Sequence, residues 1–171
     1  MGYSTGEEVY TMGIVLKESS SLPKVRTLAT GIGDAALSTA QQGIYHQLKI
    51  EEYEKNYQDY NPHGAFARYY EKHAGKEGSG GKMDSQLVQH VGFHHHNLIL
   101  EPPPGQFDII FCRNVTIYFD TNAKLKLLEK FHEHLHEGGY LIIGFYNALV
   151  PLIDKSKYKF TDMDAKIFQK I

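Results

Sequence analysis

Apolar residues in the first quarter of the chain follow the spacing of a helix, then of a strand, then of a second helix. Residues 9–16 carry apolar side chains at helical spacing after two glutamates, so we expect a helix that begins near Gly6 and ends by the serine run at 19–21. Residues 25–30 form a β-branched run that favours a buried strand, and residues 34–42 favour a helix. The last two elements predict a β-loop-α unit.

Strands and helices alternate again in the second half of the chain. Apolar runs predict strands at residues 92–100, 107–115 and 140–145. Residues 122–136 predict an amphipathic helix that ends at the glycine pair Gly138 and Gly139. Residues 158–170 contain two alternating runs around residues 161–164, which predict a closing antiparallel hairpin.

This alternation is typical of an α/β domain built on a mostly parallel sheet that helices cover on both faces. Ligands of such sheets bind beyond the carboxyl ends of the strands. We therefore expect a site in the loops after residues 26–30 and 108–112, and around residues 2–7.

Residues 46–91 differ in character from the rest of the chain. They hold many charges and a stretch at 75–81 with four glycines. Their tyrosines include Tyr53, Tyr57, Tyr60, Tyr69 and Tyr70. This composition favours an inserted subdomain or a mobile, partner-facing excursion, and we expect it to be the least ordered part of the chain.

Composition and charge exclude several classes of protein. A chain of 171 residues with 42% hydrophobic and 22% charged residues fits one folded domain, residues 1–171. With 18 basic against 20 acidic residues, it predicts no cationic surface for nucleic acid or for an anionic membrane. The single cysteine, Cys112, excludes an internal disulfide and fits a reducing compartment. No run is long and apolar enough for a membrane span and no signal peptide is evident, so we expect a cytoplasmic protein without direct membrane insertion.

A glycine loop, Gly2-Tyr3-Ser4-Thr5-Gly6-Glu7-Glu8, opens the chain. Such a loop brings backbone amides close to a ligand, although a structural turn explains two glycines at this spacing at least as often. The later blocks that matter are Leu28-Ala29-Thr30 running on to Gly43-Ile44-Tyr45, His96-Asn97-Leu98, Phe107-Asp108-Ile109-Ile110-Phe111-Cys112-Arg113-Asn114-Val115 with Ile117-Tyr118-Phe119-Asp120, and Gly138-Gly139-Tyr140-Leu141. Together the blocks resemble the catalytic domain of the chemotaxis receptor methyltransferases, the CheR family, in the family's order and over nearly the whole chain.

The resemblance implies a Rossmann-like class I methyltransferase sheet flanked by helices, and an enzyme that uses S-adenosylmethionine (SAM) to methylate glutamates of chemoreceptors. The residues it assigns to the cofactor pocket are Gly2, Thr5 and Gly6 of the glycine loop, Glu7 as a carboxylate of the pocket, Asn97 and Leu98 beside the adenine, and Asn114 and Val115 along the cofactor. A glutamate substrate, with a pKa of about 4.3, is ionised at neutral pH. Methyl transfer to it needs alignment and no general base, so no catalytic residue is assigned.

Each assigned residue also has a structural interpretation. Asn97 and Asn114 could be turn residues that close strands. Leu98 and Val115 could belong to the core, and Glu7 could simply favour the start of a helix.

Three departures from the family pattern bear on activity. Gly31 stands where the family has an aspartate that accepts hydrogen bonds from the ribose hydroxyls, and Asp34 is the residue that could reach back to replace it. Residues 144–147 read Gly-Phe-Tyr-Asn in place of Gly-His-Ser-Glu, which removes polar groups from the substrate side. The apolar strand that precedes the glycine loop in the family is missing, so we expect an uncovered sheet edge that another segment, another subunit or a rearranged strand order must cover. Formation of a homodimer is the simplest of these.

These departures keep a second function open: a degenerate family member that has lost methyl transfer and acts as a binding or scaffolding module. Metal binding is not expected. Of three consecutive histidines only His94 and His96 share a strand face, and His132 and His136 share a helix face, without the spacing of a known zinc motif.

Overall fold

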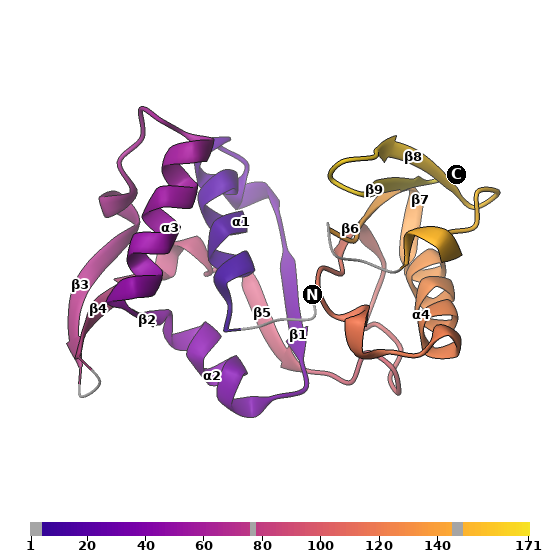
Figure 1. Cartoon of the computed structure of the whole chain (residues 1–171), viewed down its shortest axis with the longest axis horizontal. Helices are drawn as coiled ribbons and strands as arrows, with labels where there is room; N and C mark the ends of the chain where they lie inside the picture. Colours follow the sequence, from indigo (N-terminus) through magenta and orange to yellow (C-terminus); the bar gives the residue numbers. More distant parts are fainter. Residues whose placement is uncertain (1–4, 76–77, 145–148) are drawn as a thin grey trace. The chain divides into compact units, whose positions relative to one another are not determined.

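The computed structural model describes residues 5–75, 78–144 and 149–171, and the chain divides into two compact units. The N-terminal unit extends to residue 94 except for residues 30–32, and the C-terminal unit comprises residues 30–32 and 95–171. Both units contain helices and strands, which confirms a mixed α/β fold (Figure 1).

Two helices of the N-terminal unit confirm the prediction from sequence. Helix α1 spans Glu7–Glu18 and has two glutamates in its first turn, where negative charge favours a helix start. Helix α2 spans Asp34–Gln42 and ends at Gly43, whose left-handed φ of 65° lets its amide cap the last turn. The strand between them, β1, spans Thr27–Gly31 and so begins and ends later than predicted.

Residues 46–91 contain regular structure that the sequence did not predict. Helix α3 spans Gln47–Tyr60 and follows strand β2, Ile44–His46. Strands β3, Tyr70–Gly75, and β4, Gly78–Met83, complete an antiparallel sheet in the order β2-β4-β3 (Figure 1). Residues 46–91 thus contain a helix and two strands of a three-stranded sheet, and Lys76 and Glu77 of the glycine-rich stretch lie outside the described residues.

The glycines at 80 and 81 make close packing possible in this sheet. Strand β4 lies between its two neighbours, with Tyr45 and Lys72 both opposite Gly81. A Cβ atom at Gly80 would lie 2.1 Å from the carbonyl oxygen of Tyr45, and one at Gly81 would lie 2.6 Å from the Tyr70 ring. Glycine is required here by close approach of the chain, not by flexibility.

Most tyrosines of this segment build a hydrophobic core. Tyr57 and Tyr69 are 5% and 2% exposed, and Tyr53 and Tyr70 pack against the same cluster. Tyr60 is 55% exposed. Sequence reasoning linked these side chains to a partner-facing surface, whereas most of them hold α1, α3 and the β2-β4-β3 sheet together.

Strand β5 spans Val91–His95 and pairs with β1 in a two-stranded sheet. The predicted strand at 92–100 therefore ends five residues early. The backbone turns after His96 because the Asn97 side chain accepts two amide hydrogen bonds within the following residues.

The C-terminal unit is a four-stranded sheet in the order β6-β7-β9-β8. Strand β6, Phe107–Phe111, runs parallel to β7, Leu135–Ile142, and helix α4, Thr121–His134, connects them. Strands β8, Tyr158–Asp162, and β9, Ile167–Lys170, form the predicted antiparallel hairpin. The core of this unit packs between α4 and the sheet around Leu127, Phe131, Leu141 and Phe168.

Three predicted boundaries in this unit are wrong. The strand predicted to reach Val115 ends at Phe111, because Asn114 adopts a left-handed φ of 56° and a 3-10 helix follows. The helix ends at His134, and Gly138 and Gly139 lie inside β7, where the register with β6 shifts. Gly139 fits this bulge because a Cβ atom there would lie 3.0 Å from the Asp108 carbonyl oxygen.

Short 3-10 helices span Leu22–Lys24, Phe66–Tyr69, Ser85–Leu87, Thr116–Tyr118 and Val150–Leu152. Across the described ranges, no helix has both the length and the apolar composition needed to cross a bilayer.

Candidate functional site

The described end of the glycine loop belongs to the N-terminal unit. Gly6 adopts a left-handed φ of 95°, and a Cβ atom there would lie 2.6 Å from that of Ala40, so only glycine fits. Thr5 donates a hydrogen bond of 2.8 Å to the Glu7 carboxylate, which holds that side chain at the start of α1. Gly2 lies outside the described residues.

Gly31 and Asp34 are three residues apart and belong to different units. Gly31 closes β1, and its carbonyl oxygen accepts a hydrogen bond of 2.9 Å from the amide of His96. The end of β1 is thereby fixed beside the turn that carries Asn97. Asp34 is the first residue of α2 and is exposed.

The turn at residues 97–101 is held by hydrogen bonds from both sides. The side-chain oxygen of Asn97 accepts from the amides of Ile99 at 3.0 Å and Leu100 at 3.1 Å. The Lys130 ammonium on α4 donates to the carbonyl oxygens of Leu98, Ile99 and Glu101, at 3.2, 2.5 and 2.9 Å. Asn97 is therefore a turn residue, as its structural interpretation predicted. Lys130 acts as a clamp on this turn, a role that was not predicted from the sequence.

Asn114 and Val115 follow β6 in the same unit. Asn114 is exposed and holds a left-handed backbone that is uncommon outside glycine. Val115 and Leu98 pack against the same hydrophobic cluster, so the turns after β5 and β6 rest on one core. Gly144, after β7, lies beside Arg113, the residue before Asn114, since a Cβ atom there would lie 3.0 Å from the Arg113 side chain.

The predicted site residues thus fall into two groups. The C-terminal unit contains Gly31, Asn97, Leu98, Asn114 and Val115. The hydrogen bond from His96 to Gly31 and the hydrophobic cluster shared by Leu98 and Val115 bring these residues together. Thr5, Gly6, Glu7 and Asp34 belong to the N-terminal unit. Residues 145–147, where the sequence departs from the family, lie outside the described residues.

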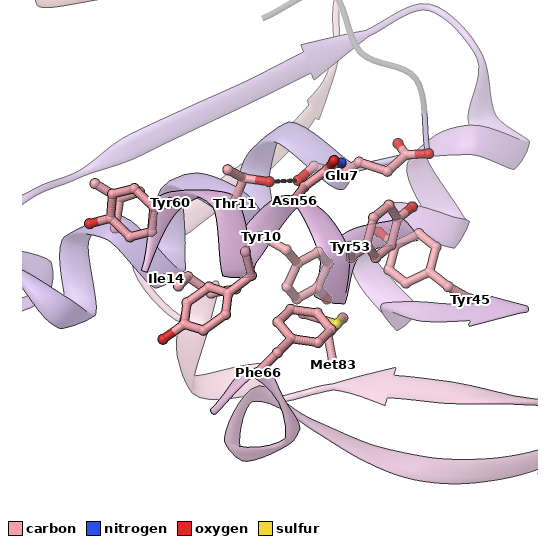
Figure 2. A pocket seen from close by; sticks show the side chains of 12 residues that line it. Glu7, Tyr10, Thr11, Ile14, Tyr45, Tyr53, Asn56, Tyr60, Phe66 and Met83 are labelled. Carbon is pink, nitrogen blue, oxygen red and sulfur yellow. Dashed lines mark hydrogen bonds between the residues drawn. The ribbon is translucent and has the colours of Figure 1, made fainter. Parts of the chain in front are cut away.

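The N-terminal unit contains a cavity of about 190 Å³ between α1 and α3 (Figure 2). We call it the tyrosine cavity, and its lining residues are Glu7, Tyr10, Thr11, Ile14, Val15, Tyr45, Tyr53, Asn56, Tyr57, Tyr60, Phe66 and Met83. Burial raises the pKa of Tyr10 to about 12 and raises the pKa of Tyr45 and Tyr53 as well, so these phenols stay neutral at physiological pH. The irregular tyrosine spacing along the chain gave no signal for this cavity.

The N-terminal unit also contains a hydrogen-bonded carboxylate, that of Glu18 at the end of α1. It accepts hydrogen bonds from the Tyr57 hydroxyl, from the Tyr69 hydroxyl at 2.8 Å and from the Asn61 amide at 3.2 Å. The hydrogen bond from Tyr57 is the main cause that lowers the pKa of Glu18.

Across residues 5–75, 78–144 and 149–171, no three histidine, cysteine, aspartate or glutamate side chains converge as a metal site.

Comparison with known proteins identifies the family. Residues 1–167 match the family described as CheR methyltransferase, SAM binding domain. A Pseudomonas putida protein named as the methyltransferase Cher3 is 38% identical over 143 residues, covering 84% of this chain and 51% of the relative. Chemotaxis protein methyltransferase 1 of Vibrio cholerae is 32% identical over 158 residues, 89% of this chain and 54% of the relative. The Borreliella burgdorferi chemotaxis protein methyltransferase is 34% identical over 149 residues, 84% of this chain and 49% of the relative.

The chain spans about half the length of the curated relatives it matches. The matched residues cover both units, from the glycine loop to strand β9. By this match the chain belongs to the CheR methyltransferase family, through the domain that is named for binding SAM.

Proposed function

We propose that this chain is the SAM-binding part of a protein-glutamate O-methyltransferase that acts on chemoreceptors. The observation that carries the proposal is the rigid turn at residues 97–101, which lies beside Gly31 and shares a core with Val115. These residues occupy three strand ends, and the carboxyl ends of strands are where α/β sheets bind ligands. The lone cysteine, Cys112, fits action in a reducing, cytoplasmic compartment.

The residues present fit the adenine end of SAM better than its ribose. Asn97 uses its side-chain oxygen within the turn, so its amide group is the part suited to a ligand, while Leu98 and Val115 supply apolar surface. Gly31 offers no side-chain acceptor for the ribose hydroxyls. When bound, SAM would supply the methyl group.

Alignment is the chemical task of the remaining residues. A substrate glutamate is already ionised at neutral pH, so attack on the methyl carbon requires only that the oxygen, carbon and sulfur atoms lie in line. The left-handed backbone at Asn114 supports a positioning role, because strained backbone is often kept at ligand sites.

We also propose that the strands belong to the Rossmann-like sheet of class I methyltransferases, with residues 46–91 as an inserted subdomain. The β6-α4-β7 segment supports this, because two parallel strands joined by a helix are the repeating unit of that fold. Strands β1 and β6 belong to different sheets among the described residues. An experimental structure that joins them in one sheet would support the proposal, and one that keeps them in separate sheets would contradict it. Self-association of the chain stays a prediction from sequence, which light scattering at high concentration can test.

A binding module without methyl transfer is the second candidate. Gly31 favours it, because losing a charged hydrogen-bond partner costs roughly 1.5–3 kcal/mol of binding free energy. Such a module would keep the fold and the receptor surface without using SAM.

Calorimetric titration of the chain with SAM tests the proposal directly. We expect saturable heat, with an affinity one to two orders of magnitude below that of relatives that keep the aspartate. Transfer of tritiated methyl groups from SAM to a chemoreceptor fragment then tests the reaction. A correctly folded chain that binds no SAM would favour the binding module instead.

Replacing Lys130 with methionine is expected to weaken SAM binding about tenfold. The ammonium group holds three carbonyl oxygens of the turn at 97–101, and methionine keeps the length of the side chain without any donor. Amide exchange at residues 98–101 should become faster in the same variant. Lys126→Met removes an exposed charge from the same helix and serves as the control; an equal loss of affinity in both variants would rule out a specific clamp.

A further inference from the structure

The tyrosine cavity has the electrostatic character of a cation site. Apart from its tyrosines, Glu7 is the one ionisable residue among the described residues that line it, and no lysine, arginine or histidine is among them. A cavity with a carboxylate and aromatic walls attracts positive charge, and its lining offers no cationic partner to a phosphate or a carboxylate ligand.

Three of the five tyrosines that line the cavity donate their hydroxyl hydrogen bonds to residues outside its lining. Tyr10 donates to the carbonyl oxygen of Ala40 at 3.2 Å, and Tyr45 donates to that of Thr5 at 2.8 Å. The Tyr57 hydroxyl donates to Glu18. With their polar ends fixed in this way, the rings contribute mainly aromatic surface to the cavity (Figure 2).

The rings also stand at steep angles to one another. Tyr45 is nearly perpendicular to Tyr10 and to Tyr53, with interplanar angles of 88° and 86° and centroid separations of 6.0 and 5.5 Å. These distances are those of rings in edge-to-face contact, so Tyr45 fixes the orientation of Tyr10 and Tyr53. Ring faces together with a carboxylate are the elements with which aromatic cages recognise quaternary ammonium groups.

Size and access limit the ligand further. The volume of about 190 Å³ is below the roughly 300–1,000 Å³ of pockets for drug-sized ligands, so only a small head group fits. Thr11, Asn56 and Tyr60 line the cavity and are exposed, with Tyr60 at 55%, so they form its entrance.

We propose that the tyrosine cavity binds a small alkylammonium cation, with the Glu7 carboxylate and the aromatic rings as its recognition elements. The ligand class is a quaternary or primary ammonium on a short apolar body. The site does not depend on the proposed methyl transfer, and all of its lining residues belong to the N-terminal unit.

Nuclear magnetic resonance titration of the chain with choline, without SAM, tests the proposal. We expect saturable shifts at the lining residues, and at least tenfold weaker binding of 3,3-dimethyl-1-butanol, the neutral analogue of the same shape. Equal binding of the two ligands, or shifts confined to other parts of the chain, would overturn it. Because SAM is absent, failure here leaves the proposed function untouched, and failure of SAM binding leaves this proposal untouched.

Two pairs of variants separate the recognition elements. Glu7→Gln should weaken choline binding about tenfold, whereas Glu8→Gln removes the same charge from the same helical turn outside the cavity and should not. Tyr60→Leu should weaken binding severalfold while Tyr60→Phe, which keeps the ring, retains it. Equal effects of the two glutamine variants, or unchanged binding in Tyr60→Leu, would show that the carboxylate or the ring plays no part and would overturn the proposal.

Discussion

Replacing Glu18 with alanine is expected to lower the free energy of unfolding by about 3 kcal/mol, because burying polar groups without a partner costs roughly 1–3 kcal/mol each. The carboxylate accepts hydrogen bonds from Tyr57, Tyr69 and Asn61, and both tyrosines are at most 5% exposed. Alanine is an excellent helix former, so the loss would come from the hydroxyls and not from α1 itself.

Chemical denaturation of the intact chain measures this loss, with Glu54→Ala as the matched control. Glu54 lies on α3, and the described part of the chain gives it no hydrogen-bond partner. Glu18→Gln should fall between the wild type and Glu18→Ala, since it keeps an acceptor without the charge. If Glu18→Ala and Glu54→Ala lost equal stability, the hydrogen bonds to Glu18 would be energetically negligible.

The effect of Glu18 should also depend on pH. The hydrogen bond from Tyr57 lowers the pKa of Glu18 below its ordinary value of 4.5. A group with a lowered pKa stabilises the fold fully above its ordinary pKa and loses this contribution as the pH falls towards the lowered value. The difference in stability between wild type and Glu18→Ala should therefore be constant from pH 6 to 8 and shrink as the solution is acidified below about pH 4.5.

The second large effect is expected from Gly31→Asp, which should strengthen SAM binding about ten- to a hundredfold. Gly31 closes β1 in extended backbone, where an aspartate side chain needs no unusual conformation. The new carboxylate would stand beside the turn that carries Asn97 and would accept hydrogen bonds from the ribose hydroxyls.

Calorimetry on three variants resolves the cause of any gain. Ile32→Asp places the same charge on the neighbouring residue, which is 65% exposed, and should change the affinity little. Gly31→Asn keeps an acceptor without the charge and should give part of the gain. A fall of tenfold or more in the dissociation constant for Gly31→Asp alone supports a weakened enzyme, whereas undetectable SAM binding before and after the change supports the binding module.

Sequence reasoning succeeded where one pattern controls one element. Helix α1 follows from its apolar spacing together with the acidic residues of its first turn, and helix α2 has the bounds predicted for it. The C-terminal hairpin follows from alternation on both sides of a turn. In these cases the local preference of the chain and the final fold agree.

It failed where tertiary contacts decide the outcome. Nothing local distinguishes a glycine pair that ends a helix from one that forms a bulge inside a strand, as Gly138 and Gly139 do against β6. The contribution of Lys130 to the turn at 97–101 depends on an element about 30 residues further along the chain, so sequence spacing alone gave no reason to select it.

The glycines of β4 have a practical meaning for protein engineering. By composition, residues 78–81 look like a linker, the usual place to insert an affinity tag or to attach a fluorophore. Yet Gly80 and Gly81 occupy the centre of a sheet in which a single added methyl group would lie within 3 Å of Tyr45 or Tyr70. A tag placed there would separate β2 from β3, so labels for studying this protein belong on exposed positions such as those of helix α4 that face solvent.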